Sequence, residues 1–315
     1  MICQVGFEPR YIEPSPDNRR LCIVIPCYNE SRKLKIARFK SYLADHPRVH
    51  LTFVNDGSGD DTLQILTSIK QMIPEQTDVI NLEQNSGKAE AVRAGILYAL
   101  ENNSCESIGY LDADLAVSLE ECDLLSKSIN KEIDFCFGSR ILRMGSVIER
   151  KPTRFLIGRA VATIISQVLQ LKVYDTQCGC KLFHADLAQK IFREPFISKW
   201  LFDVEIFFRI LQLHGRKDAI RKMVEIPLNE WIDQGDSKVK PTYFFRMLYD
   251  LLRIRQHYRN GLKNAGLVHR ALYPVNDFSS RLYQYRIGKR AVPFRVNGFN
   301  EFVLIAFRID IIRKR

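Results

Sequence analysis

The stretch Ile108-Gly109-Tyr110-Leu111-Asp112-Ala113-Asp114 joins a short apolar run to two carboxylates that follow it directly. The apolar run is typical of a buried strand. Because alternate residues of an extended backbone point the same way, Asp112 and Asp114 would emerge together where the strand ends. Paired carboxylates suit Mg²⁺ or Mn²⁺, which bind one or two carboxylates plus substrate phosphates. We predict a divalent-metal site here; two solvated loop aspartates are the alternative.

Similar apolar runs flank this stretch, and segments with helical spacing separate them. The predicted strands cover residues 21–25, 51–54, 79–82, 108–111 and 135–138. The predicted helices cover residues 31–44, 62–72, 88–100, 152–172, 199–214 and 242–260. Strands that alternate with helices favour an α/β fold with a mostly parallel sheet and helices on both faces.

Polar residues follow three of the predicted strands. They are Pro26-Cys-Tyr-Asn-Glu30, Asn55-Asp-Gly-Ser58 and the Asp112-Ala-Asp114 segment. In open parallel sheets, ligands gather at the carboxyl ends of the strands, so we expect these segments to form one site. Within it, Asp56 would accept hydrogen bonds from a nucleotide base or ribose; helix capping alone is the alternative.

The segment Asn85-Ser-Gly-Lys-Ala-Glu-Ala-Val-Arg93 begins a predicted helix with cationic side chains near its positive end. A helix N-terminus attracts phosphate, and Lys88 and Arg93 would add charge. The segment is not a P-loop, because the glycine spacing and the Lys-Ser/Thr ending are absent.

Charge divides the chain of 315 residues unevenly. Residues 241–315 contain 15 Lys and Arg but only 4 Asp and Glu, whereas residues 1–240 contain 32 of each kind. We therefore expect a catalytic domain at residues 1–240 and a basic, helical extension at residues 241–315 that contacts a membrane surface or a partner. No nucleic-acid-binding motif accompanies the basic residues, so a nucleic-acid partner is not expected.

The eight cysteines are scattered, and several fall in predicted strands, which suggests buried free thiols in a reducing compartment. The first 20 residues are polar and do not resemble a signal peptide. The longest apolar stretch, residues 155–171, contains Arg159 and is shorter than the roughly 20 residues that a membrane span needs. These features predict a cytoplasmic protein.

Further motifs narrow the interpretation. They are Gly138-Ser-Arg140, Asp175-Thr-Gln-Cys-Gly-Cys-Lys-Leu-Phe183, Trp200-Leu-Phe-Asp-Val-Glu205 and Gly235-Asp-Ser-Lys-Val239. Together with the segments above, they resemble the family 2 glycosyltransferases of the Rossmann-like GT-A fold. Within that family the set is similar to dolichyl-phosphate β-glucosyltransferases and bacterial polyprenyl-phosphate glycosyltransferases. The resemblance covers roughly residues 20–260.

The resemblance implies an inverting transfer of a hexose from a nucleotide-diphosphate sugar, with UDP-glucose favoured, to a polyprenyl phosphate. Four residues would hold the nucleoside: Pro26, Tyr28, Glu30 and Asp56. Asp112 and Asp114 would hold the metal on the diphosphate. Arg140 and Lys238 would neutralise phosphates, and Glu205 would face the sugar. Ala116 stands where mannosyl-type relatives have Gln, which leaves the third metal ligand open.

The acceptor decides whether a base is needed. A lipid phosphate is already an anion and needs none, whereas a saccharide hydroxyl would need a carboxylate such as Asp203 or Glu205. A transferase acting on a saccharide hydroxyl is one alternative, and a non-catalytic nucleotide- or polyanion-binding protein is another. We further expect residues 155–171 and 243–258 to lie in the plane of an anionic membrane surface, at its cytoplasmic face.

Overall fold

The computed structural model describes residues 19–149, 152–232, 242–264, 283–287 and 290–294. The chain divides into two compact units, residues 1–265 and 266–315. In the second unit, strands β10 (Tyr283–Ile287) and β11 (Arg290–Phe294) form an antiparallel hairpin, where the sequence suggested a helical extension. Lys238 and its motif at residues 235–239 lie outside the described residues.

Seven strands form the main sheet of the first unit, in the order β3-β2-β1-β4-β7-β5-β8. They are β1 (Leu21–Cys27), β2 (Val49–Asp56), β3 (Thr77–Leu82), β4 (Ser107–Leu111), β5 (Phe135–Ser139), β7 (Cys180–His184) and β8 (Met223–Pro227). Only β7 runs antiparallel to its neighbours in this sheet, β4 and β5. Strands β6 (Val147–Glu149) and β9 (Glu230–Ile232) pair separately. The predicted mostly parallel sheet is confirmed.

Of the seven strands in the main sheet, the five predicted ones are β1 to β5, whereas β7 and β8 were not predicted. Each of the missed strands carries a charged residue at or near its centre, Lys181 in β7 and Glu225 in β8. A charge interrupts the apolar run from which a buried strand is recognised. The partners described below make it possible for Lys181 to be fully buried and for Glu225 to be partly buried.

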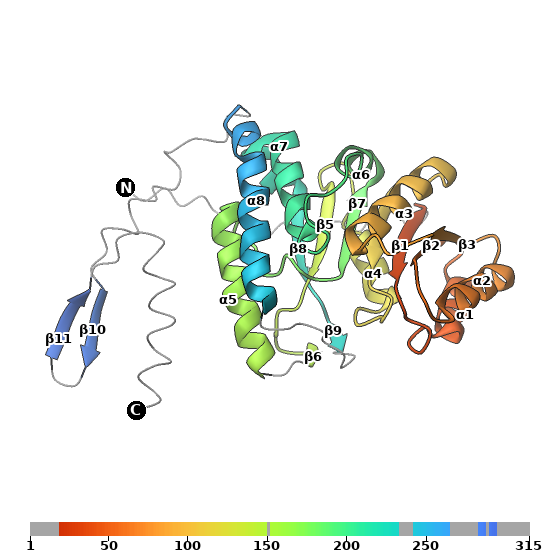
Figure 1. Ribbon diagram of the computed structural model, residues 1–315, viewed down its shortest axis with the longest axis horizontal. Coiled ribbons are helices and arrows are strands. Elements are labelled where there is room, and N and C mark those ends of the chain that lie inside the picture. The colour runs from red at the N-terminus through yellow and green to blue at the C-terminus, as the bar shows by residue number, and fades with distance from the viewer. Residues whose placement is uncertain (1–18, 150–151, 233–241, 265–282, 288–289, 295–315) are drawn as a thin grey trace. The chain divides into compact units, whose positions relative to one another are not determined.

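Helices cover both faces of the sheet (Figure 1). On one face, helices α1 (Ile36–Asp45), α2 (Thr62–Met72) and α4 (Leu119–Ser126) share a buried apolar cluster with the strands. On the other face, the apolar cluster draws on α3 (Lys88–Asn102), α5 (Pro152–Leu169), α6 (Ala185–Ile191), α7 (Phe202–Lys222) and α8 (Thr242–Asn264). Burying both faces is what allows the strands to be apolar throughout.

Helix α8 packs along α7 as part of the first unit (Figure 1). Leu251, Ile254 and Tyr258 are buried in the contact, and Ser198 Oγ donates to Asp250 Oδ2 at 2.7 Å. The first unit therefore continues to residue 265, beyond the division that we expected at residue 240. Within the described part of the chain, no helix has both the length and the apolarity to cross a membrane.

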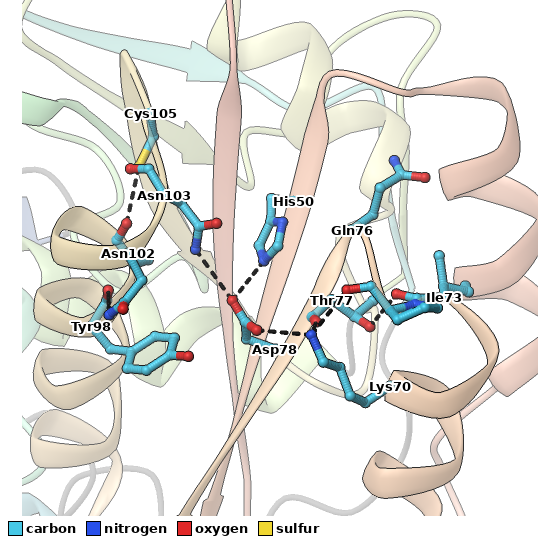
Figure 2. Close-up of polar contacts among 12 residues, drawn as sticks. His50, Lys70, Ile73, Gln76, Thr77, Asp78, Tyr98, Asn102, Asn103 and Cys105 are labelled. Carbon is cyan, nitrogen blue, oxygen red and sulfur yellow. Dashed lines mark hydrogen bonds and ion pairs between the residues drawn. The ribbon is translucent and has the colours of Figure 1, made fainter.

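A polar network lies at the amino end of β2 and β3 (Figure 2). Asp78 Oδ2 accepts hydrogen bonds from His50 Nε2 at 2.8 Å and from Asn103 Nδ2 at 3.3 Å, and Lys70 Nζ lies 3.0 Å from Asp78 Oδ1. Burial lowers the pKa of His50, and Asp78 opposes that effect. The network lies at the opposite edge of the sheet from the polar segments that follow the strands, so it stabilises the sheet away from the candidate site.

Candidate active site

The loops that follow β1 and β2 are joined by hydrogen bonds. The backbone N–H of Asn29 donates to Ser58 Oγ at 3.0 Å, and Ser31 Oγ donates to Asp60 Oδ2 at 2.6 Å. Although burial acts in the opposite direction, hydrogen bonds from Ser31 and Thr62 lower the pKa of Asp60 to about 2. The ionised Asp60 thus holds together two loops that are distant in sequence.

This junction positions three of the residues expected to hold the nucleoside. Pro26 is the penultimate residue of β1, and the Tyr28 side chain is 44% exposed beside it. The backbone N–H of Glu30 donates to Thr62 Oγ1 at 2.9 Å. An exposed aromatic ring at the end of a central strand can stack on a base, which is compatible with a nucleoside site. The nucleoside role of these residues stays a prediction.

Asp56 ends β2 and is 3% exposed. Its Oδ1 accepts from the N–H of Ser86 at 2.7 Å and its Oδ2 from that of Gly87 at 2.9 Å. A side chain at Gly57 would place its Cβ 2.5 Å from the backbone nitrogen of Asn85, and the φ of +62° also favours glycine. Asp56 therefore fixes the loop before α3, and each carboxylate oxygen keeps a lone pair for a ligand.

Lys88 is the first residue of α3, directly after Gly87 with its φ of +93°. Its Nζ lies 2.5 Å from Asp112 Oδ1. Burial alone would lower the pKa of Lys88, but the charges of Asp112 and Asp203 raise it above its usual value. The structure thus brings together two residues that the sequence assigned to separate motifs, and Lys88 remains a cation.

Asp114 lies in a tight turn after β4. The N–H of Leu115, whose φ is +51°, donates to the carbonyl of Asp112 at 3.1 Å, and the N–H of Ala116 donates to Asp114 Oδ1 at 3.0 Å. Burial and, after it, the charge of Asp112 raise the pKa of Asp114. Two carboxylates whose charges repel each other favour a cation between or beside them.

We tested whether these residues fit the divalent metal implied by the resemblance. The Lys88 ammonium against Asp112 shows that this carboxylate accepts a cation, and the charge of Asp112 adds to the effect of burial in raising the pKa of Asp114. Among the described residues, His, Cys, Asp and Glu side chains do not gather in groups of three or more that could hold a metal. Two carboxylates with substrate phosphates and water still match Mg²⁺ or Mn²⁺ chemistry, so the residues fit.

Arg140 follows β5 and forms a bidentate ion pair. Its Nε lies 2.6 Å from Asp175 Oδ2 and its Nη2 lies 2.8 Å from Asp175 Oδ1, while the guanidinium stacks 5.5 Å from the ring centre of Trp231. Burial opposes the charge, but Asp175 raises the pKa of Arg140. The pair is neutral overall, so Arg140 offers a phosphate less positive charge than the sequence suggested.

Asp203 has buried partners. Lys181 Nζ lies 2.5 Å from Asp203 Oδ1 and donates to the Cys178 carbonyl at 2.6 Å, and the Tyr110 hydroxyl also donates to Asp203. Lys181 is 0% exposed. Asp203 is therefore the counterion of a buried lysine, which leaves it poorly placed to take a proton from an acceptor.

Glu205 lies on the side of α7 that faces α8. The side chain is 0% exposed. Its Oε1 accepts from Arg209 Nη2 at 2.8 Å and from the Tyr258 hydroxyl at 2.9 Å, and its Oε2 accepts from the N–H of Ile197 at 2.8 Å. These contacts join α7 to α8. The structure does not bring Glu205 to Asp112 and Asp114, where we expected it to face the sugar.

Arg93 also has partners of its own. Its guanidinium lies 2.9 Å and 2.6 Å from the two carboxylate oxygens of Glu90, and it donates to the carbonyl of Arg193 at 3.2 Å. Arg93 therefore binds Glu90 and the backbone just after α6, and its hydrogen bonds are not made with Asp112 or Asp114. Of the two cations predicted on this helix, only Lys88 contacts Asp112.

Sequence reasoning gave no role to three residues that organise the site: Asp175, Lys181 and Glu225. The Glu225 carboxylate accepts from the backbone N–H of Tyr174 at 2.9 Å and from that of Asp175 at 2.7 Å. Asp175 and Lys181 stand in the motif at residues 175–183, which was recognised as a pattern only. A charged residue within an otherwise apolar segment was the available signal for Lys181 and Glu225, because a charge in the interior requires a partner.

Residues 22–192 match the family model described as "Glycosyl transferase family 2". The matched region contains the carboxylate pair, Lys88 and the loops joined by Asp60. The chain belongs to glycosyltransferase family 2 and is a glycosyltransferase, as the resemblance implied.

Curated relatives extend the likeness beyond the matched region. The chain is 31% identical over 297 residues to a dolichyl-phosphate beta-glucosyltransferase of Trichomonas vaginalis, covering 85% of this chain and 84% of that protein. It is 29% identical to the dolichyl-phosphate beta-glucosyltransferase of Homo sapiens and 30% identical to that of Saccharomyces cerevisiae, with 77% of this chain covered in each case. The human protein is covered over 77% of its length and the yeast protein over 76%.

Solved structures share the fold. Glucosyl-3-phosphoglycerate synthase from Mycobacterium tuberculosis, in complex with uridine diphosphate, matches with a TM-score of 0.54 and 17% identity, covering 76% of this chain and 80% of that one. Mannosyl-3-phosphoglycerate synthase from Rubrobacter xylanophilus matches with a TM-score of 0.57 and 16% identity, covering 88% and 86%. The GT-A fold is therefore confirmed.

Proposed function

We propose that this glycosyltransferase moves glucose from UDP-glucose to a polyprenyl phosphate of the dolichyl type, with inversion at the anomeric carbon. The observation that carries the proposal is the group of Lys88, Asp112 and Asp114 where β4 ends. The curated relatives named above support the sugar and the acceptor, because each is named a dolichyl-phosphate beta-glucosyltransferase. A M. tuberculosis structural neighbour, crystallised with Mn²⁺ and UDP-glucose, supports the donor and the metal.

The chain's own residues divide the work on the donor. Tyr28, Glu30 and Asp56, with Pro26 beside them, would hold the nucleoside at the ends of β1 and β2. Asp112 and Asp114 would hold Mg²⁺ or Mn²⁺, which when bound offsets the charge that develops on the leaving diphosphate. Lys88 remains protonated beside Asp112 and adds a second cation in the same place.

The acceptor side needs no general base in this proposal. A lipid phosphate is an anion near neutral pH and can attack the anomeric carbon directly. A saccharide hydroxyl would have to lose a proton to a carboxylate. The two carboxylates suggested for that role are already paired: Asp203 with the buried Lys181, and Glu205 with Arg209, whose side chain is 10% exposed. This arrangement favours the phosphate acceptor over the saccharide alternative.

Arg140 and Lys238 remain the candidates for binding phosphate. Arg140 is bound to Asp175, so it would orient the acceptor side of the site rather than supply a free positive charge. Lys238 lies outside the described residues, and its role rests on the motif at residues 235–239 alone.

A membrane surface is the natural place for such an acceptor, and we propose peripheral binding there. Helices α5 and α8 each bury one side in the core, through Ile165 and Leu169 in α5 and through Leu251 and Ile254 in α8. Apolar side chains remain exposed on both helices and on the loop before β6: Leu156, Ile157, Tyr249, Leu252, Leu142 and Met144. Exposed apolar residues next to basic ones bind anionic lipid.

The test is direct transfer. The purified protein is incubated with radiolabelled UDP-glucose, dolichyl phosphate in detergent and Mn²⁺, and the organic phase is counted. Label in the organic phase, abolished by EDTA and by Asp112→Asn, is the expected result. Label that stays in water-soluble product would contradict the lipid acceptor, and equal transfer with and without EDTA would contradict the metal.

A further inference from the structure

Gly179 lies against the carboxylate of Asp112. A Cβ added at Gly179 would be 2.1 Å from Asp112 Oδ2, 2.4 Å from Cγ and 2.9 Å from Oδ1. The φ of Gly179 lies outside the left-handed region, so its backbone does not itself demand glycine. What requires glycine at this position is therefore the close approach of one acidic side chain.

The strand register explains why the two residues meet. Strands β4 and β7 pair antiparallel up to Leu111 and Cys180, and the N–H of Asp112 then donates to the Gly179 carbonyl at 3.1 Å. Directly opposed residues of an antiparallel pair place their side chains on the same face, about 5 Å apart at Cβ. Without a side chain at Gly179, the Asp112 carboxylate can lie across the neighbouring backbone.

The segment that carries Gly179 has little freedom to move aside. Asp175 binds Arg140 through both carboxylate oxygens, and its own N–H donates to Glu225 at 2.7 Å. The Cys178 carbonyl accepts from the fully buried Lys181 Nζ at 2.6 Å. By contrast, the Asp112 side chain is 38% exposed. A side chain at position 179 would therefore displace the carboxylate rather than the segment.

We propose that Gly179 is a positioning residue that sets the direction of the Asp112 carboxylate toward Lys88 and Asp114. The expected effect on metal binding rests on the proposed function, in which Asp112 is one of the two carboxylates that would hold the metal. Changing groups that orient metal ligands typically weakens metal binding about 10- to 100-fold.

The main test compares Gly179→Ala with Gly158→Ala, a matched control. Gly158 lies in α5 with nothing within 4 Å of an added Cβ and no positive φ. Mn²⁺ binding is measured by electron paramagnetic resonance in the presence of UDP, because the expected metal shell includes phosphate oxygens. We expect the Kd for Mn²⁺ to rise at least about tenfold in Gly179→Ala and to stay unchanged in Gly158→Ala. Equal Kd values for Gly179→Ala and the unsubstituted protein would overturn the inference.

A second measurement tests the contact between position 179 and the Asp112 carboxylate in the absence of metal. The thermal midpoint is determined for Gly179→Ala alone and in an Asp112→Ala background, where the clashing atoms are gone. We expect Gly179→Ala to lower the thermal midpoint by less than half as much in the Asp112→Ala background as in the unsubstituted protein. The effects of substitutions at two residues in contact are not additive. An equal loss in both backgrounds means that Gly179 does not act through Asp112. If this coupling is found but the unsubstituted protein binds no Mn²⁺ in the presence of UDP, the positioning role stands and the metal assignment fails.

Discussion

The ammonium nitrogen of Lys181 lies 2.5 Å from Asp203 Oδ1 inside the protein, where the lysine side chain has no exposure to solvent. The pair joins β7, the one reversed strand of the main sheet, to the start of α7. The Tyr110 hydroxyl and the Cys178 carbonyl complete the hydrogen bonding. A carboxylate that the sequence suggested as a catalytic base is thus part of the structural support behind the candidate site.

Replacing Lys181 by Met should destabilise the protein strongly. The substitution leaves Asp203 buried without its cation, and losing one member of a buried pair costs about 3–5 kcal/mol. Urea unfolding measures the loss. The double substitution Lys181→Met with Asp203→Leu is expected to recover part of it, since no charge then remains buried. A single variant as stable as the original protein would contradict the assigned role of the pair.

Glu205→Gln should lower the free energy of unfolding and leave kcat nearly unchanged. The carboxylate holds Arg209, Tyr258 and the backbone of Ile197, so the neutral amide leaves Arg209 buried with a weaker partner. We expect kcat of the folded fraction to stay within about threefold of the original value. Arg209→Met serves as the matched variant from the other side of the pair. A kcat loss of about 100-fold at unchanged stability would restore Glu205 to the catalytic group.

Asp114→Ala should abolish transfer and leave the fold intact. Its carboxylate lies half-buried in a turn after β4, where it accepts from the N–H of Ala116 at 3.0 Å. Removing it takes away one local hydrogen bond and the repulsion from Asp112, but no apolar core packing. Turnover at saturating Mn²⁺ and the thermal midpoint are measured on the same sample. Asp45→Ala, at the exposed end of α1, is the control and should change neither. Turnover above about a tenth of the original would rule out the metal role.

His50 should make stability depend on pH. Its folded pKa is lowered by burial, so the unfolded chain takes up a proton first, near a pH of about 6.5. Stability is therefore fully present above that pH and falls as the pH drops toward the folded pKa. We expect the urea midpoint to fall less between pH 7.5 and 5.5 in His50→Gln than in the unsubstituted protein. The more exposed His184→Gln is the control; an unchanged pH slope in His50→Gln would contradict the expectation.

Met144→Glu should weaken binding to anionic vesicles. Met144 is fully exposed on the loop before β6, and Met72, 55% exposed at the end of α2, offers a matched site elsewhere. Sedimentation with anionic and neutral vesicles, at low and high salt, provides the measurement. Binding should require anionic lipid, fall with salt, and drop in Met144→Glu but not in Met72→Glu. Equal binding of both variants would exclude this loop from the membrane contact.

Much of the fold and part of the site could be predicted from local sequence patterns. Apolar runs located β1 to β5, because a strand buried on both faces is apolar throughout. The parallel order then placed the ends of β1, β2 and β4 at one edge, which brought Tyr28, Asp56 and Asp112 into a single region. The motifs also implied the family, which the comparisons confirmed.

What only the tertiary structure decided was which charged side chains pair across the fold and which lie in the core. The sequence shows that Lys88, Arg93, Asp203 and Glu205 are charged, but an ion pair forms between residues that the fold brings within about 4 Å. Lys88 reaches Asp112 from a different motif, and Asp203 is held by Lys181 from another strand. Arg93 with Glu90 and Glu205 with Arg209 are instead neighbours at i, i+3 and i, i+4 on their own helices, a spacing that the sequence already shows. Local spacing determines where a strand or helix lies; which charges remain available for chemistry depends on packing between segments that are far apart in sequence.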